Sequence, residues 1–202
     1  YHPKHSNKIK NKDFSFLITG KFNYKLKDSL ILSILSIKKC NIKGYNFKLN
    51  IHGYLDYKLN KLLHQKIYEL NLQNNIFING SYDQENANKI YNNNDVFLFL
   101  IYKAPCSNSV LEALSSGLPI IYSNSGGTPE LVGDAGIGLS VDDSYQEYLN
   151  PDIEEVQKAM VEIYKNYENK SKKARQRAVE YYNIDNWFET HLKIMRDLLN
   201  AK

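Results

Sequence analysis

The feature that most constrains the fold is an apolar run of seven residues from Val96 to Tyr102, the longest in the chain. Apolar and polar side chains do not alternate in it, which is typical of a strand that is covered on both faces. Such strands lie in the middle of parallel sheets that have helices packed on either side. The run is far shorter than the ~20 residues needed to cross a bilayer, so no transmembrane helix is expected there. The sequence therefore predicts a parallel α/β domain.

Shorter apolar segments alternate with segments of helical periodicity along the rest of the chain. Strands are expected near residues 14–18, 47–51, 76–78, 95–100, 119–122 and 138–141. Helices are expected near residues 28–40, 60–70, 83–92 and 107–116, briefly from 128, and from 151 to the end with breaks near Asn169 and Asn183. Glycines at 20 and 53 mark strand ends, and Asp28 and Thr128 are predicted helix N-caps. The alternation predicts right-handed βαβ units and a doubly wound, Rossmann-like parallel sheet.

The composition excludes several other classes of protein. The 43% of apolar and 24% of charged residues describe a folded domain and not a disordered chain. The net charge of +4 accompanies many lysines, asparagines and tyrosines, whose codons are AT-rich, so it indicates no nucleic-acid partner. Cys40 and Cys106 form no CxxC pair, which fits a reducing, cytoplasmic compartment. The basic stretch at 170–177 fits either a solvated helix face or peripheral contact with the inner face of an anionic membrane.

Three sections of the chain differ in pattern. Residues 1–13 are polar and without periodicity, and we interpret them as a linker remnant, because a chain that opens Tyr1-His2-Pro3 without methionine reads as excised from a longer protein. Residues 14–182 hold all the predicted strands and form the expected domain. Residues 183–202 form a separate C-terminal helix.

An open parallel sheet binds its ligand outside the carboxyl ends of its strands. The loops that follow these ends are residues 20–27, 53–56, 80–83, 102–109 and 123–128. The first loop carries Lys21, Lys25 and Lys27, and the helix at 107–116 opens with free N–H groups that suit an anion. A phosphate-bearing ligand is therefore expected at this edge of the sheet.

Motifs of several other nucleotide and metal sites are absent from the sequence. A dinucleotide site needs GxGxxG directly after the first strand, where the chain has GKFN at 20–23. The P-loop pattern GxxxxGK[ST] is also absent. The five histidines have no HExxH or HxxxH spacing, so no zinc site is predicted. Cys106 has no histidine near it in sequence and is not assigned as a nucleophile.

Two consecutive runs carry a resemblance to a known family. They are NSVLEALSSGLPII at 108–121 and SNSGGTPELV at 123–132, with further matches in NDVF at 94–97 and GDAG at 133–136. The chain resembles the donor-binding, C-terminal half of a GT-B glycosyltransferase of retaining family 4, over about residues 14–200 and most strongly from Gly80 to Gly138.

The resemblance implies a transferase that moves a sugar from a nucleotide diphosphate sugar to a glycan or lipid-linked acceptor. The anomeric configuration would be retained, and neither a metal nor another cofactor would be needed. The resemblance also implies a role in polysaccharide or glycolipid assembly and an N-terminal acceptor domain outside this chain, against which residues 183–202 would pack. The chain alone is then expected to be inactive.

The resemblance also assigns residues to the donor site. Glu112 would hold the ribose hydroxyls, which a carboxylate binds through charge-assisted hydrogen bonds. Lys21 and Lys25 would be catalytic by neutralising the departing diphosphate, with Lys27 as the alternative to Lys25. Ser81 and Tyr82 would lie near the base, where Tyr82 either stacks on it or caps a loop. The remaining donor-binding residues are Gly20, Ser107, Asn108, Ser109, Gly126 and Gly127, of which the last two either let backbone approach the donor or form a plain turn.

Two departures from the family pattern keep other functions open. Ala104 stands where the first of the family's paired glutamates would contact the sugar, and Lys21 replaces an arginine, which loses bidentate geometry. The loop PCSN at 105–108 resembles a variant of this region within the same broad family. One alternative is a degenerate, non-catalytic domain for sugar-nucleotide binding or assembly. Another is a nucleotide-sugar 2-epimerase of the same shape, which would lack the sequence context at 125–130.

Overall fold

The computed structural model describes residues 13–144 and 146–200. Within these residues, six parallel strands form one sheet in the order β3-β2-β1-β4-β5-β6. The strands are β1 (Phe14–Phe22), β2 (Phe47–Leu55), β3 (Ile76–Ile78), β4 (Val96–Phe99), β5 (Ile120–Ser123) and β6 (Gly136–Leu139). The strand order reverses between β1 and β4, which confirms the doubly wound, Rossmann-like fold and places its ligand crevice at the carboxyl ends of the strands.

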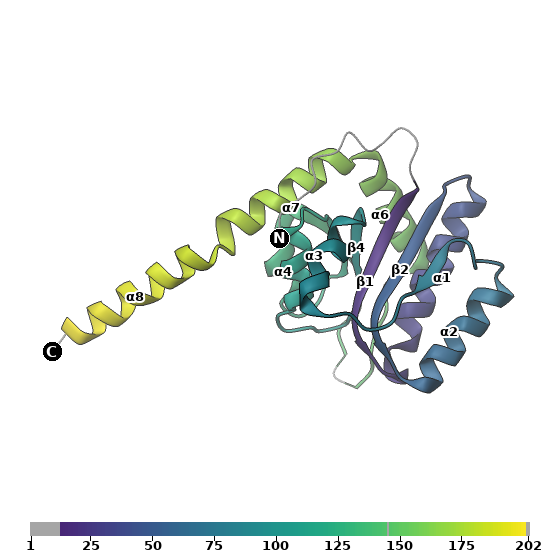
Figure 1. Cartoon of the computed structure of the whole chain (residues 1–202), viewed down its shortest axis with the longest axis horizontal. Helices are drawn as coiled ribbons and strands as arrows, with labels where there is room; N and C mark the ends of the chain where they lie inside the picture. Colours follow the sequence, from purple (N-terminus) through teal and green to yellow (C-terminus); the bar gives the residue numbers. More distant parts are fainter. Residues whose placement is uncertain (1–12, 145, 201–202) are drawn as a thin grey trace.

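Helices cover both faces of the sheet (Figure 1). The helices are α1 (Lys27–Ile42), α2 (Tyr57–Glu69), α3 (Gln84–Asn92), α4 (Asn108–Ser115), α5 (Thr128–Val132), α6 (Ile153–Lys165), α7 (Tyr167–Tyr181) and α8 (Ile184–Asn200), with short 3-10 turns η1 (Tyr24–Leu26) and η2 (Gly133–Ala135). One apolar cluster joins the sheet to α1, α2 and α6, and a second joins it to α3, α4, α5 and α7.

The central strand β4 explains the apolar run that first indicated the fold. Val96 and Leu98 belong to the first apolar cluster, whereas Phe97 and Phe99 belong to the second. All four side chains are buried. Both faces of β4 therefore lie in a core, which is why its sequence shows no alternation.

Two predicted strand ends are wrong, because β1 and β2 continue past their glycines and pair as far as Phe22 and Leu55. In this register Gly20 lies opposite Gly53. Gly53 has φ +127°, and a Cβ atom on it would lie 1.8 Å from the carbonyl oxygen of Gly20. Glycine is therefore needed here for the close approach of two strands, and it does not mark a stop.

Several smaller boundaries also differ from the prediction. Helix α1 has Leu26 as its N-cap, and Asp28 lies in the first turn, where its charge favours the helix dipole. Helix α5 includes Thr128 and is capped by Gly127. Strand β6 begins at Gly136, two residues before its predicted start. The helical break expected near 169 lies at Asn166, between α6 and α7.

The last helix, α8, extends away from the body of the domain (Figure 1). None of its described residues is buried, and its exposed apolar side chains include Trp187, Phe188 and Leu198. No helix in the described part of the chain is both long enough and apolar enough to span a membrane. The predicted linker remnant at 1–13 lies outside the described residues except for Asp13, which directly precedes β1.

Candidate functional site

A cavity of about 310 Å³ lies at the carboxyl ends of β1 and β2. It brings together five of the predicted site residues, from three separate stretches of the chain: Gly20, Lys21, Ser81, Tyr82 and Glu112. Its other lining residues are Gly53, Tyr54, Gln84 and Ala87. Gly53 and Tyr54 were not predicted as site residues, although they belong to the segment 53–56 that the sequence singled out, which the structure places at the end of β2. Gln84 and Ala87 carried no sequence signal for a site, because they lie within an ordinary helix.

Glu112 is held in this cavity by a hydrogen bond from a neighbouring helix. It lies in α4, and the hydroxyl group of Tyr91 in α3 donates to its Oε2 atom at 2.9 Å. The Tyr91 hydroxyl also lies 3.0 Å from Oγ1 of Thr19 in β1. Burial is the main cause that raises the pKa of the Tyr91 phenol far above its ordinary value, so the hydroxyl keeps its proton.

The predicted lysines are divided between two places. Lys21 lies in β1 and lines the cavity that holds Glu112. Lys25 lies in η1 and lines a different, much smaller cavity together with Leu100 and Tyr102. The alternative residue, Lys27, pairs with Asp28 at 2.6 Å, and this hydrogen bond raises the pKa of the lysine. Lys21 is thus the lysine that the structure places with Glu112.

The loop that carries these lysines is tied to the start of α2 by Asp56. One carboxylate oxygen of Asp56 accepts from the backbone N–H of Tyr24 at 2.6 Å, and the other accepts from that of Leu59 at 2.8 Å. The second bond is the N-cap of α2. Asp56 thereby fixes the path of the chain between Lys21 and α1.

The start of α4 carries the three residues that were predicted at the phosphates. Ser107 is the N-cap of this helix, and its Oγ atom lies 2.7 Å from that of Ser109. Asn108 is the first helical residue. None of the three lines the cavity of Glu112 as the structure describes it, but the same helix carries both them and the carboxylate. The N-terminal end of a helix favours an anion.

Gly126 and Gly127 allow a neighbouring loop to approach. A Cβ atom on Gly126 would lie 2.4 Å from the Ala104 carbonyl oxygen, and one on Gly127 would lie 1.8 Å from that of Pro105. The backbone N–H of Gly127 donates to the Ala104 carbonyl at 2.9 Å. Close packing against the loop at 104–105 thus explains why both positions are glycine. Their contact with a donor stays a prediction.

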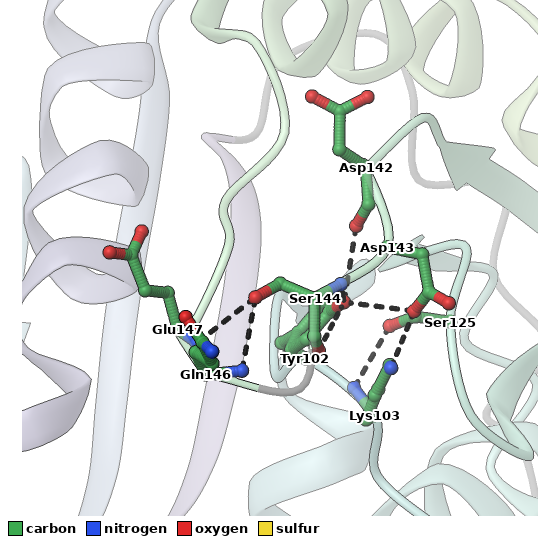
Figure 2. Close-up of polar contacts among 8 residues, drawn as sticks. All are labelled: Tyr102, Lys103, Ser125, Asp142, Asp143, Ser144, Gln146 and Glu147. Carbon is green, nitrogen blue, oxygen red and sulfur yellow. Dashed lines mark hydrogen bonds and ion pairs between the residues drawn. The ribbon is translucent and has the colours of Figure 1, made fainter.

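The loop that contains Ala104 is held on its other side by a polar cluster (Figure 2). The backbone N–H of Lys103 donates to Ser125 Oγ at 2.9 Å, and its ammonium group pairs with Asp143 at 2.5 Å. This ion pair lowers the pKa of the Asp143 carboxyl. The Tyr102 hydroxyl accepts from the backbone N–H of Ser144 at 2.6 Å. The cluster fixes the chain after β4 next to the chains that follow β5 and β6.

His52 and Cys106 lie near the site without forming a catalytic arrangement. The ring of His52 packs edge-on against Tyr82 at 6.0 Å, and its Nε2 atom lies 3.1 Å from Asn79 Nδ2. Burial lowers the pKa of His52. The Cys106 thiol is exposed. Among the described residues, no group of three or more His, Cys, Asp or Glu side chains is arranged to hold a metal ion.

A larger groove of about 780 Å³ lies between α1 and α6. It is lined by apolar, basic, acidic and amide side chains, including Lys43, Glu154, Lys158 and Val161. None of the predicted site residues lines it. The candidate site is therefore the cavity of about 310 Å³ that is lined by Lys21, Tyr82 and Glu112.

The sheet order and the reversal between β1 and β4 define a Rossmann-like α/β domain. Residues 3–177 match the sequence profile of the glycosyl transferases group 1. The chain belongs to this family of GT-B glycosyltransferases.

Three known proteins show how far the similarity extends. An uncharacterized glycosyltransferase of Methanocaldococcus jannaschii is 37% identical over 91 residues, which are 45% of this chain and 21% of that protein. Sucrose-phosphate synthase from Thermosynechococcus elongatus superposes with a TM-score of 0.73 at 19% identity, covering 94% of this chain and 46% of that one. Anabaena HepE, in complex with UDP and glucose, gives a TM-score of 0.73 at 17% identity, covering 91% and 48%. The chain spans less than half the length of each of them.

Proposed function

We propose that this chain is the donor-binding domain of a retaining family 4 glycosyltransferase, which transfers a sugar from a nucleotide diphosphate sugar to a glycan or lipid-linked acceptor. The observation that carries the proposal is the single cavity in which Lys21, Tyr82 and Glu112 meet. Membership of the glycosyl transferases group 1 supports it. The UDP and glucose bound to the structurally similar HepE favour a nucleotide-sugar donor.

Each part of such a donor has a partner in the proposed site. Glu112 accepts hydrogen bonds from the vicinal ribose hydroxyls, because each oxygen of an ionised carboxylate has two acceptor sites and forms strong, charge-assisted bonds. Tyr82 offers an aromatic face to the base, and Tyr54 lines the same cavity. The diphosphate binds to Lys21 and to the N-terminal end of α4, which Ser107 caps.

The proposed catalysis is electrostatic. When the bond between the sugar and the phosphate breaks, its electron pair stays on the phosphate oxygen, and the charge of Lys21 stabilises the leaving diphosphate. Lys25 is the proposed second cation, although it lines a different cavity. Neither a metal nor another cofactor has a role in this proposal.

The acceptor is proposed to bind to a domain outside this chain. The exposed apolar face of α8, which includes Trp187 and Phe188, offers a contact for that domain. Sugar transfer then needs both domains, so this chain alone would bind the donor without turning it over. Its proposed place is the cytoplasm, at the inner face of a membrane where lipid-linked glycans are assembled.

A second candidate is a degenerate domain that binds a sugar nucleotide without catalysis. Ala104 favours it, because this position supplies only a backbone carbonyl, bonded to Gly127, where the family pattern has a carboxylate. A protein containing both domains separates the two candidates. Turnover of a sugar nucleotide that is lost in Glu112→Ala refutes the degenerate domain, and binding without turnover favours it.

Calorimetry on this chain tests donor binding directly. UDP, GDP, ADP and their sugar conjugates are titrated at millimolar concentration into the chain and into its Glu112→Ala variant. Glu162→Ala is the matched control, since it removes an exposed carboxylate on α6, on the other face of the sheet. We expect one nucleotide to bind to the wild type and the control and to lose most of its affinity for Glu112→Ala. Equal binding to all three proteins would refute the assigned site.

A further inference from the structure

Tyr91 forms the middle of a hydrogen-bonded chain that ends on Glu112. Its side chain is fully buried, and its ring packs against Phe97 with the centroids 5.8 Å apart. Its hydroxyl oxygen lies 2.9 Å from Oε2 of Glu112 and 3.0 Å from Oγ1 of Thr19. The contact joins three elements, because Thr19 lies in β1, Tyr91 in α3 and Glu112 in α4.

The direction of these hydrogen bonds follows from the groups involved. An ionised carboxylate only accepts, so the single hydroxyl proton of Tyr91 is donated to Glu112. The Tyr91 oxygen is then left as an acceptor, and Thr19 donates to it. Burial raises the pKa of the Tyr91 phenol, which favours the protonated hydroxyl that this direction needs.

The contact with Tyr91 engages one of the two carboxylate oxygens of Glu112. Tyr91 occupies Oε2, whereas the Glu112 side chain lines the cavity that also holds Lys21 and Tyr82. A glutamate side chain has three rotatable bonds, and ordering them only when a ligand arrives weakens binding. A hydrogen bond that is already formed in the free protein removes much of this ordering from the binding step.

We propose that Tyr91 is a positioning residue for the donor ribose: it holds the Glu112 carboxylate by Oε2, so that Oε1 meets the vicinal hydroxyls of a nucleoside diphosphate. Thr19 supports this role by holding the Tyr91 hydroxyl from the opposite side. The inference deepens the proposed function and rests on it. It gives a residue that does not touch the sugar a part in recognising the ribose hydroxyls.

The test compares Tyr91→Phe with the wild type, using the nucleoside diphosphate that binds and its 2′,3′-dideoxy analogue. Phenylalanine keeps the ring against Phe97 and removes only the hydroxyl. We expect about a threefold to tenfold weaker affinity for the ribonucleotide, from the usual cost of ordering one flexible side chain on binding. The analogue, which has no hydroxyls for Glu112, should change less than twofold. This difference between the two ligands is a readout that general loosening of the domain does not produce.

Three further variants complete the test, of which the first is a control. Tyr167→Phe removes the hydroxyl of another tyrosine whose pKa burial raises, to about 12, and it packs against Phe14 at the opposite end of β1. It should bind both ligands like the wild type. Thr19→Val should weaken ribonucleotide binding by a smaller factor than Tyr91→Phe, and Thr19→Ser should restore it, because serine keeps the hydroxyl.

A measurement without any ligand separates this inference from the proposed function. In the wild type, the Tyr91 hydroxyl proton should give a slowly exchanging NMR signal, which shifts in Glu112→Ala and is missing in Tyr91→Phe. If that signal is present and no nucleotide binds to the wild type, the proposed function fails and the inference falls with it. If nucleotides bind and Tyr91→Phe weakens both ligands equally or neither, the positioning role alone is overturned.

Discussion

The close approach of β1 and β2 beside the cavity predicts an unusually large effect for Gly53→Ala. Gly53 has φ +127°, and an added Cβ would lie 1.8 Å from the Gly20 carbonyl oxygen. Two costs follow: an L-residue in this backbone region costs about 1–3 kcal/mol, and a forced shift in a packed strand pair costs about 1–3 kcal/mol more. We expect a loss of about 4 kcal/mol in the free energy of unfolding, out of a typical ~5–15 kcal/mol.

Gly44→Ala is the matched control for this prediction. Gly44 also has a positive φ, +92°, but no atom lies within 4 Å of its added Cβ. Only the backbone cost of roughly 1–2 kcal/mol applies to it. The difference between the two variants therefore isolates the contact with Gly20.

Urea unfolding followed by circular dichroism measures both variants. With an m value of about 2 kcal/mol per molar, Gly53→Ala should lower the midpoint by about 2 M and Gly44→Ala by less than about 1 M. Nucleotide affinity should also fall in Gly53→Ala, since Gly53 lines the cavity. Equal midpoints for the two variants would show that β1 and β2 do not approach each other as described.

Three further predictions follow from the site and the last helix. Lys21→Ala should weaken nucleoside diphosphate binding about fivefold to tenfold and make the affinity less dependent on salt. Lys25→Ala should weaken binding less, because Lys25 lines another cavity, and equal losses of affinity in calorimetry would contradict the different places of the two lysines. Burial lowers the pKa of His52, so the unfolded chain binds a proton at a higher pH than the folded chain does. The free energy of unfolding should therefore decrease as the pH falls below about 6.5, the ordinary pKa of histidine. His52→Asn should flatten the pH dependence of the unfolding midpoint between about pH 7 and pH 5, and an unchanged slope would refute the assignment. A chain that ends at Asn183, without α8, should keep its unfolding midpoint within about 0.5 M urea, because none of the described residues of α8 is buried, and a larger loss would show that α8 supports the domain.

The sequence predicted the elements whose signals are local. The apolar run in β4 and the helical periodicity of α3 and α4 each depend on a few neighbouring residues, and the structure places these three elements within a few residues of their predicted bounds. The resemblance around Glu112 likewise rests on a continuous run of residues. The strand ends at Gly20 and Gly53 were mispredicted, because a glycine that permits close packing and a glycine that ends a strand look alike in sequence.

What the sequence by itself determined is therefore the order and type of the elements, the family and the edge of the sheet where a ligand is expected. Only the tertiary structure decided that Lys21 shares a cavity with Glu112 while Lys25 does not, and that Tyr91 donates to that glutamate. The physical reason is the distance along the chain over which each kind of signal acts. Periodicity and turn residues act over a few positions, whereas Tyr91 and Glu112 are 21 residues apart and meet only because two helices pack on the same face of the sheet.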